Sequence, residues 1–167
     1  SIFFFTIKAN QRNLKILAPA ESLNGLTIGA LYDDFTNANE TARFIWAVDR
    51  GLPSPVSAIG KGYRSVITPD LFYYGGREFI RGKFDGKIDW VESLREPGCL
   101  SAAPYGTGDA DGCAFSFGTS DAAAQITHEA AKCHDVLNQV FLAQTGSKIP
   151  VEATAILLKA MLTHGAS

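Results

Sequence analysis

Cysteine and histidine are both scarce in this sequence, with three of each among 167 residues. The cysteines, Cys99, Cys113 and Cys133, form no CxxC pair and are odd in number. This pattern disfavours a zinc site and a disulfide framework. It slightly favours a reducing compartment such as the cytoplasm as the location of the protein. One disulfide with one free thiol is the alternative.

An excess of charge of one sign is also lacking. Fifteen basic and 17 acidic residues give a net charge of −2, and no block of like charges occurs. Nucleic acids and anionic membranes attract basic patches, so the sequence offers no electrostatic reason to expect either as a partner. The length, with 46% hydrophobic residues and no internal repeat, predicts one domain over residues 1–167.

The apolar segment 1–7 has no basic residue before it and is followed at once by Lys8. It is too short to cross a bilayer and lacks the layout of a signal peptide. Its aromatic and β-branched residues predict a buried strand of a parallel sheet instead. Because natural chains rarely begin inside a central strand, we expect this chain to be a piece of a larger protein.

Three later segments have the patterns of extended chain. The apolar run 26–31 predicts a second buried strand, in which Gly29 allows another backbone to approach closely. The run 66–76 is expected to begin extended and to end in a turn at its two glycines. Charged and apolar residues alternate over 77–97, which predicts a β-hairpin.

Two segments are rich in turn residues. Residues 33–65 predict long surface loops, with one short helical turn at 41–47. The Gly- and Asp-rich loop 97–112 contains Asp109 and Asp111 in alternation, a spacing found in calcium loops. It lacks the twelve-position pattern with a closing Glu, so a plain turn is favoured over a calcium site. We therefore expect no cofactor.

Two helices are predicted near the C-terminus. Apolar residues recur at spacings of three and four over 121–145, and Gly146 supplies the stop signal. The alanines of its early turns suggest close packing against a sheet. A second helix is expected to open at Pro150, which suits a first turn, and to run through Leu162.

The segment Gly118-Thr119-Ser120 stands directly before the first of these helices. A Ser at this place is most often an N-cap. The sharper interpretation is a nucleophile, because the start of a helix also favours developing negative charge. His128 lies two turns further on, about 12 Å away at 1.5 Å per residue, which is too far to accept the proton of Ser120.

Several segments, taken in order, resemble the C-terminal part of the catalytic domain of subtilisin-like serine proteases. Gly118-Thr119-Ser120 followed by small residues resembles the nucleophile motif of that family, Gly-Thr-Ser-x-Ala. Four further segments are similar to the family's A-G-N, I-x-V-G-A, K-P-D-[IV]-x-A-P-G and closing-helix motifs: Lys8-Ala9-Asn10, Leu26–Ala30, Thr68–Gly75 and Leu158–Ala166. The resemblance covers nearly the whole chain except the loops at 33–65 and 77–117.

The resemblance implies the C-terminal portion of an α/β, three-layer fold with a mostly parallel sheet. It implies that Ser120 is the acylating nucleophile and that Asn10 donates to the oxyanion, together with the backbone N–H of Ser120. Lys8, Ala9 and Thr119 would contact the substrate. The Asp and His of the family's triad precede the oxyanion Asn and so would lie upstream of Ser1, which makes this chain inactive alone.

Departures from the family pattern support a different hypothesis, a catalytically degenerate module that binds peptides or proteins. Ala9 replaces a Gly, Tyr74 replaces a Pro, and Ala124-Gln125 replaces the usual Pro-x after the nucleophile. Lys8 either points away from the primary specificity pocket or biases it toward acidic side chains. The expected partners are a peptide or protein substrate, and either the upstream half of the same protein or a second copy of this chain.

An unrelated α/β-hydrolase is the remotest alternative. Its order of Ser, Asp and His could use Asp135 and His164 with Ser120. No Gly-x-Ser-x-Gly turn surrounds Ser120, so we favour the two hypotheses above.

Overall fold

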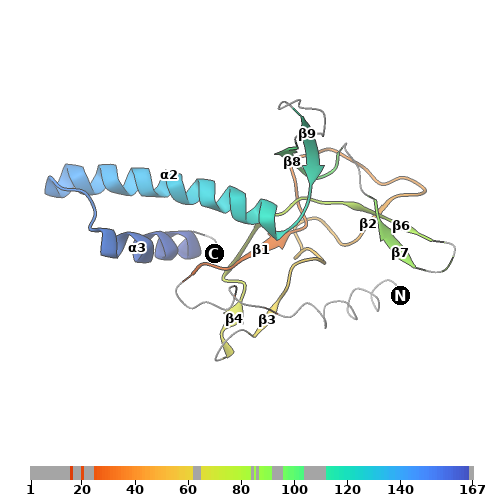
Figure 1. Ribbon diagram of the computed structural model, residues 1–167, viewed down its shortest axis with the longest axis horizontal. Coiled ribbons are helices and arrows are strands. Elements are labelled where there is room, and N and C mark those ends of the chain that lie inside the picture. The colour runs from red at the N-terminus through yellow and green to blue at the C-terminus, as the bar shows by residue number, and fades with distance from the viewer. Residues whose placement is uncertain are drawn as a thin grey trace.

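The computed structural model describes residues 16, 20, 25–61, 65–83, 85, 87–91, 96–103 and 112–165. The strand predicted at 1–7 lies outside this part of the chain. Figure 1 shows short strands gathered at one end of a long helix, with a second helix running back beside it. The strands are β1 (Ile28–Leu31), β2 (Ile45–Trp46), β3 (Gly60–Lys61), β4 (Ile67–Thr68), β5 (Leu71–Tyr74), β6 (Phe79–Gly82), β7 (Ile88–Trp90), β8 (Cys99–Ala102) and β9 (Cys113–Ser116); the helices are α2 (Thr119–Thr145) and α3 (Val151–His164).

The strand predicted at 26–31 is confirmed as β1, which pairs in parallel with β5. Gly29 faces Leu71–Tyr74, where a Cβ would lie 2.5 Å from the ring of Phe72 and 2.6 Å from Pro69. The close neighbours that require this glycine are therefore side chains, rather than the backbone that the sequence led us to expect. The α2 helix packs on both strands.

A mostly parallel sheet is not what the described strands form. Of the five strand pairings among the described residues, only β1–β5 is parallel. The others are antiparallel and join small sheets of two or three strands. Three of these antiparallel pairings, β3–β4, β6–β7 and β8–β9, join consecutive strands as hairpins, and a hairpin connection can only make antiparallel neighbours. The fourth, β2–β6, joins distant segments.

The hairpin predicted over 77–97 is confirmed as β6 and β7. The helical turn predicted at 41–47 is wrong, because Ile45 and Trp46 form β2 and pair with β6. The ring of Trp46 stacks on Phe79 at 4.1 Å between centroids. This contact between distant segments decides the conformation, whereas the local polar residues had favoured a turn.

The segment 97–112 was predicted as a loop, and its first part is instead β8, which pairs with β9. Ser101 and Ser116 face each other across this hairpin, with their hydroxyl oxygens 2.8 Å apart. Four of the eight residues in β8 and β9 are cysteine or alanine, which carry little strand signal of their own, so the sequence pattern missed the pairing.

Both predicted helices are confirmed. Of the early alanines expected to pack against the sheet, Ala122 is buried, together with Ile126, whereas Ala124 is exposed. Gly146 ends it in a left-handed conformation with φ 72°. Pro150 caps α3 from outside, instead of occupying its first turn. Among the described helices, none combines the length and the apolar character needed to cross a membrane.

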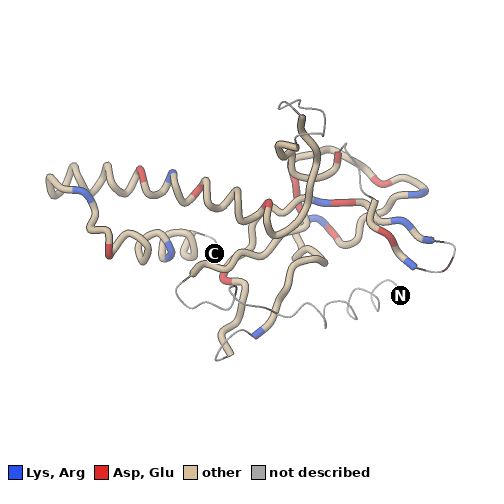
Figure 2. Tube along the Cα trace, in the orientation of Figure 1, with Lys and Arg blue, Asp and Glu red and all other residues tan. Residues whose placement is uncertain are grey.

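Figure 2 shows acidic and basic residues interspersed along the described chain, without a large region of one sign. The two helices also expose apolar side chains: Val136, Val140, Leu142, Val151, Ile156, Leu157 and Met161. Apolar surface of this kind is typical of faces that another polypeptide covers.

Candidate functional site

The turn before α2 places Ser120 on the surface. Gly118 is the N-cap residue, with φ 147° and ψ 179°, a conformation that essentially only glycine adopts. Thr119 and Ser120 follow as the first two helical residues, and both are exposed. No side chain caps this helix, so the simple capping role of Ser120 is wrong. Its hydroxyl makes no hydrogen bond with any described residue.

This turn contacts the end of β5. The N–H of Gly118 donates to the carbonyl oxygen of Gly75 at 2.7 Å. A Cβ at Gly75 would lie 2.4 Å from that of Ala30 and 3.1 Å from Gly118 O, so only glycine fits there. The side chain of Gln125, one turn into α2, donates to the carbonyl oxygen of Tyr74 at 2.9 Å.

The start of β5 is held to the other helix. Asp70 accepts a hydrogen bond from the N–H of Thr27 at 2.7 Å, just before β1. Lys159 of α3 places its Nζ 3.9 Å from Asp70 Oδ1 and donates to the carbonyl oxygen of Gly25 at 2.6 Å. One lysine therefore joins α3 to the segments that lead into β1 and β5.

Asp121 links the helix start to the hairpin β8–β9. Its Oδ1 accepts hydrogen bonds from the hydroxyls of Ser116 at 2.7 Å and Ser101 at 3.2 Å. The carboxylate also lies in the first turn of α2, where the positive end of the helix dipole stabilises negative charge. The hairpin is thus fixed to the residue that follows Ser120.

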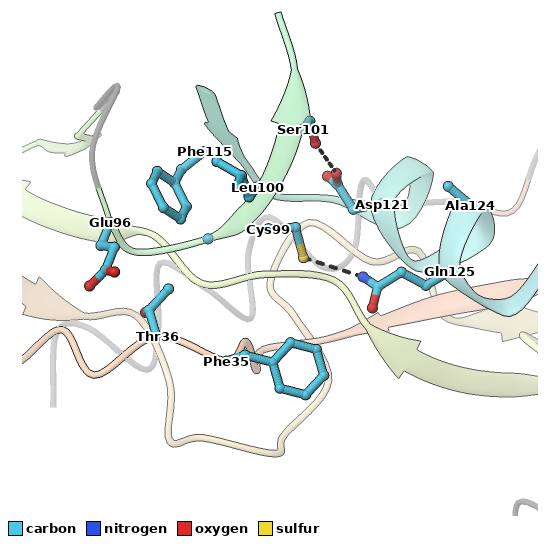
Figure 3. A pocket seen from close by; sticks show the side chains of 11 residues that line it. Phe35, Thr36, Glu96, Cys99, Leu100, Ser101, Phe115, Asp121, Ala124 and Gln125 are labelled. Carbon is cyan, nitrogen blue, oxygen red and sulfur yellow. Dashed lines mark hydrogen bonds between the residues drawn. The ribbon is translucent and has the colours of Figure 1, made fainter. Parts of the chain in front are cut away.

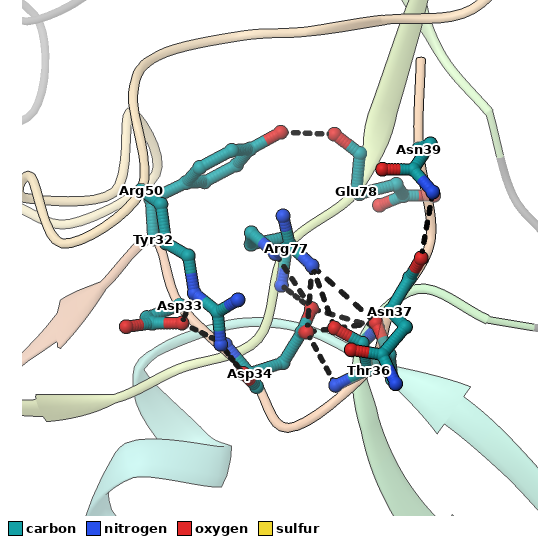
Figure 4. Close-up of polar contacts among 10 residues, drawn as sticks. Tyr32, Asp33, Asp34, Thr36, Asn37, Asn39, Arg50, Arg77 and Glu78 are labelled. Carbon is teal, nitrogen blue, oxygen red and sulfur yellow. Dashed lines mark hydrogen bonds and ion pairs between the residues drawn. The ribbon is translucent and has the colours of Figure 1, made fainter. Parts of the chain in front are cut away.

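A buried ion pair, Asp34 with Arg77, joins the loop after β1 to the residues before β6 (Figure 4). The carboxylate of Asp34 is fully buried and accepts hydrogen bonds from Arg77 Nη2 at 3.0 Å and Nε at 3.1 Å. It also accepts hydrogen bonds from the backbone N–H and the hydroxyl of Thr36, and from the N–H of Gly98 at 3.1 Å. Arg77 also lies over the ring of Trp46, 4.3 Å from its centroid. These contacts join the loop after β1, the residues before β6 and the entry to β8.

Two opposing effects set the ionisation of Asp34. Burial alone would raise the pKa of this carboxyl, but the hydrogen bonds from Arg77 and Thr36 outweigh it, and the pKa lies below its usual value of 3.8. Asp34 is therefore ionised at neutral pH. Its charge is matched by Arg77, which makes it a structural group rather than a proton donor.

Sequence reasoning missed this pair, because Asp34 and Arg77 are 43 residues apart and were assigned to a loop and to a hairpin. The one sequence feature that could have indicated a buried acidic group is the pair Asp33-Asp34 directly after a buried strand. Neighbouring Asp33 pairs with Arg50 at the surface.

A pocket of about 490 Å³ opens beside the start of α2 (Figure 3). Its described lining comes from the loop after β1, the strand β8 with the residues just before it, the strand β9 and the first turns of α2: Phe35, Thr36, Glu96, Gly98, Cys99, Leu100, Ser101, Phe115, Asp121, Ala124 and Gln125. Burial, and then the nearby charge of Asp121, raises the pKa of the Cys99 thiol to about 11. Cys99 is therefore protonated at neutral pH and is a poor nucleophile.

None of the described histidines contacts Ser120. His128 is exposed on α2, and His134 contacts Asn138 at 2.8 Å and Asp135 at 3.4 Å. Asp135 lies fifteen residues beyond Ser120 on one continuous helix, about 22 Å away at 1.5 Å per residue. The α/β-hydrolase alternative, which needed Asp135 near Ser120, is therefore wrong.

The other predicted site residues lie outside the described part of the chain. These are the expected oxyanion donor Asn10, the substrate contacts Lys8 and Ala9, and the pair Asp109 and Asp111. Thr119 is described, and it sits exposed beside Ser120. Within the described residues, no group of three or more His, Cys, Asp or Glu side chains is placed to hold a metal ion.

Comparison with protein-family models, curated proteins and solved structures finds no match to this chain. Its function is therefore inferred from the residues and their geometry.

Proposed function

We propose that this chain is the nucleophile-bearing C-terminal part of a subtilisin-like serine endopeptidase. In this proposal Ser120 is the nucleophile, the upstream half of the parent supplies the Asp and His, and the chain alone is inactive. Asn10 and the backbone N–H of Ser120 would form the oxyanion hole, with Lys8, Ala9 and Thr119 beside the substrate.

One observation carries the proposal: four segments chosen by resemblance converge in space. Leu26–Ala30 contains three of the four residues of β1, and Thr68–Gly75 contains β5, its parallel partner. Gly118 then bonds to Gly75, and Lys159 of the last segment lies beside Asp70. The segments that carry the motifs are thus neighbours in space, as the proposal requires.

The position of Ser120 suits the chemistry. Its exposed hydroxyl has no hydrogen-bond partner among the described residues, and its backbone N–H belongs to the first turn of α2, where N–H groups have no intrahelical acceptor. Such a free N–H, aimed at developing negative charge, stabilises an oxyanion. A hydroxyl without a base is a weak nucleophile, which agrees with an inactive half.

The proposed reaction is acyl transfer in two steps. As Ser120 Oγ bonds to the scissile carbonyl carbon, its proton passes to the histidine of the upstream half. That proton then goes to the leaving nitrogen as the C–N bond breaks. Water next attacks the acyl-enzyme, giving its proton to the same histidine, and the ester oxygen of Ser120 recovers a proton as the acid product leaves.

The test is fluorophosphonate labelling of this chain, alone and with the upstream half of the parent. We expect a mass shift at Ser120 only when both halves are present, and its loss in Ser120→Ala. Ser147→Ala is a matched control, because Ser147 is an exposed serine just beyond the far end of α2. This control should leave labelling unchanged.

Two outcomes would overturn the proposal. If the halves associate but Ser120 is not labelled, the chain belongs to a degenerate module that binds peptides without cleaving them. If the parent cleaves peptide bonds normally with Ser120→Ala, the nucleophile lies elsewhere.

A further inference from the structure

The pocket beside α2 combines apolar walls with unused hydrogen-bond acceptors. Its rings and aliphatic side chains come from Phe35, Phe115 and Leu100. Phe35 and Leu100 remain 75% and 65% exposed. Large apolar side chains left open around a hollow of about 490 Å³ form a surface that an apolar ligand group can cover.

The side-chain donors of the described lining are already used. The hydroxyl of Thr36 donates to Asp34 at 2.8 Å. The hydroxyl of Ser101 lies within hydrogen-bond distance of Asp121 and Ser116, which use its one donor. The amide nitrogen of Gln125 donates to Tyr74 O at 2.9 Å and to Cys99 Sγ at 3.4 Å. What remains is the weak S–H donor of Cys99.

The acceptors, in contrast, are left over. Oδ2 of Asp121, Oε1 of Gln125 and the carboxylate of Glu96 make no hydrogen bond with a described residue, whereas Asp121 Oδ1 is occupied by serines. Figure 3 shows Glu96 and Asp121 at opposite sides of the hollow. Among the described lining residues there are two carboxylates and no basic side chain.

We infer that this pocket binds a basic side chain of the peptide substrate, that is, an apolar stem or ring that ends in a cation. The walls would cover the apolar part, and the free carboxylate and amide oxygens would accept the hydrogen bonds of a guanidinium or ammonium group. The assignment to a substrate rests on the proposed function, because the pocket begins at Asp121, the residue next to Ser120. The preference for a cation rests on the pocket alone.

The test compares two probes of nearly equal shape, benzamidine and benzamide, of which only benzamidine is charged. Each is titrated into the 167-residue chain at low salt, with binding followed by calorimetry and by the NMR signals of Gly98 and of the Gln125 side chain. We expect benzamidine to bind about three- to tenfold more tightly, with signals shifting at both residues. The ratio should shrink as salt screens the partly exposed carboxylates.

Glu96→Gln and Asp121→Asn keep the shape of the pocket and remove one charge each. Each should reduce the preference for benzamidine about two- to threefold, and the double variant should bring the ratio close to one. Asp49→Asn is the matched control: Asp49 is exposed, and it does not line the pocket. Circular dichroism of each variant checks that the fold is retained.

Equal affinities of the unmodified chain for benzamidine and benzamide would overturn the inference. So would a preference that survives the double variant, since the cation would then bind elsewhere. Ser120→Ala should bind benzamidine like the unmodified chain. If fluorophosphonate does not label Ser120 but benzamidine still binds preferentially, the proposed protease is rejected and the cation preference of the pocket remains. If Ser120 is labelled but benzamidine shows no preference, only the inference about the pocket is rejected.

Discussion

Gly118 and Gly75 meet backbone to backbone, with the N–H of Gly118 2.7 Å from the carbonyl oxygen of Gly75. Neither residue can carry a side chain without cost, since Gly118 has φ 147° and a Cβ on Gly75 would overlap Ala30. The end of β5 and the start of α2 are therefore in direct contact. This contact fixes where Ser120 stands relative to the parallel strand pair.

Gly118→Ala should destabilise the chain by about 1–3 kcal/mol, because an L-residue rarely adopts this backbone conformation. The space around Gly118 is not the cause, since a Cβ there would meet Ser120 Oγ only at 3.8 Å. Chemical denaturation measures the free energy of unfolding. In the reconstituted parent, the same change should also slow fluorophosphonate labelling of Ser120.

Gly82→Ala is the comparison for this prediction. Gly82 ends β6, has no φ in the positive range, and a Cβ added there would meet no atom within 4 Å. Its replacement should change the free energy of unfolding by less than about 0.5 kcal/mol. Equal effects of the two substitutions would show that the conformation of Gly118 is not required.

Asp34→Asn should destabilise the chain by about 3–5 kcal/mol, because it leaves the charge of Arg77 buried without its partner. Arg77→Met removes the other partner and should cost a similar amount. The double variant should be less destabilised than the sum of the two, since no unpaired charge remains. Strict additivity in this cycle would contradict a direct coupling between the two side chains.

The same pair predicts a dependence of stability on pH. The pKa of Asp34 lies below the usual 3.8 in the folded chain, so its contribution is fully present above that value. The contribution is lost as the pH falls below 3.8 toward the folded pKa. Between about pH 5 and pH 2, the free energy of unfolding should therefore fall less steeply in Asp34→Asn than in the unmodified chain.

Asp85→Asn is a control for this titration. The pKa of Asp85 is also lowered, by hydrogen bonds from Lys87, but the carboxyl is on the surface. Its removal should alter the pH dependence much less than removal of Asp34. Indistinguishable profiles for the two variants would argue against a special role of the buried pair.

Cys99 should react slowly with iodoacetamide. At pH 8, a thiol whose pKa is raised to about 11 carries about a hundredfold less thiolate than one at the usual 9.0. Its thiolate is more nucleophilic in compensation, so we expect a rate about tenfold lower than that of an ordinary thiol. Peptide mass spectrometry over time compares Cys99 with exposed Cys113 in the same chain. Equal rates at the two sites would contradict the environment described for Cys99.

Local pattern was enough to predict the helices and part of the strands. The helical spacing over 121–145 and the stop at Gly146 reproduce α2, because these signals act within one or two turns of the same helix. The alternation over 77–97 likewise predicted β6 and β7, whose residues pair with near neighbours in sequence. The position of Ser120 at the start of α2 followed from the same local signals.

Tertiary structure alone decided the rest. Trp46 is in a strand because Phe79 stacks on it. Asp34 is a buried ion because Arg77, 43 residues later in the sequence, forms an ion pair with it. The pocket beside α2 combines side chains from four separate segments, so no window of the sequence contains it. Such contacts depend on how distant segments pack, which local propensities do not encode. Local signals thus placed both helices to within about two residues at each end, because those signals act within a turn. Packing between distant segments decided what surrounds Ser120.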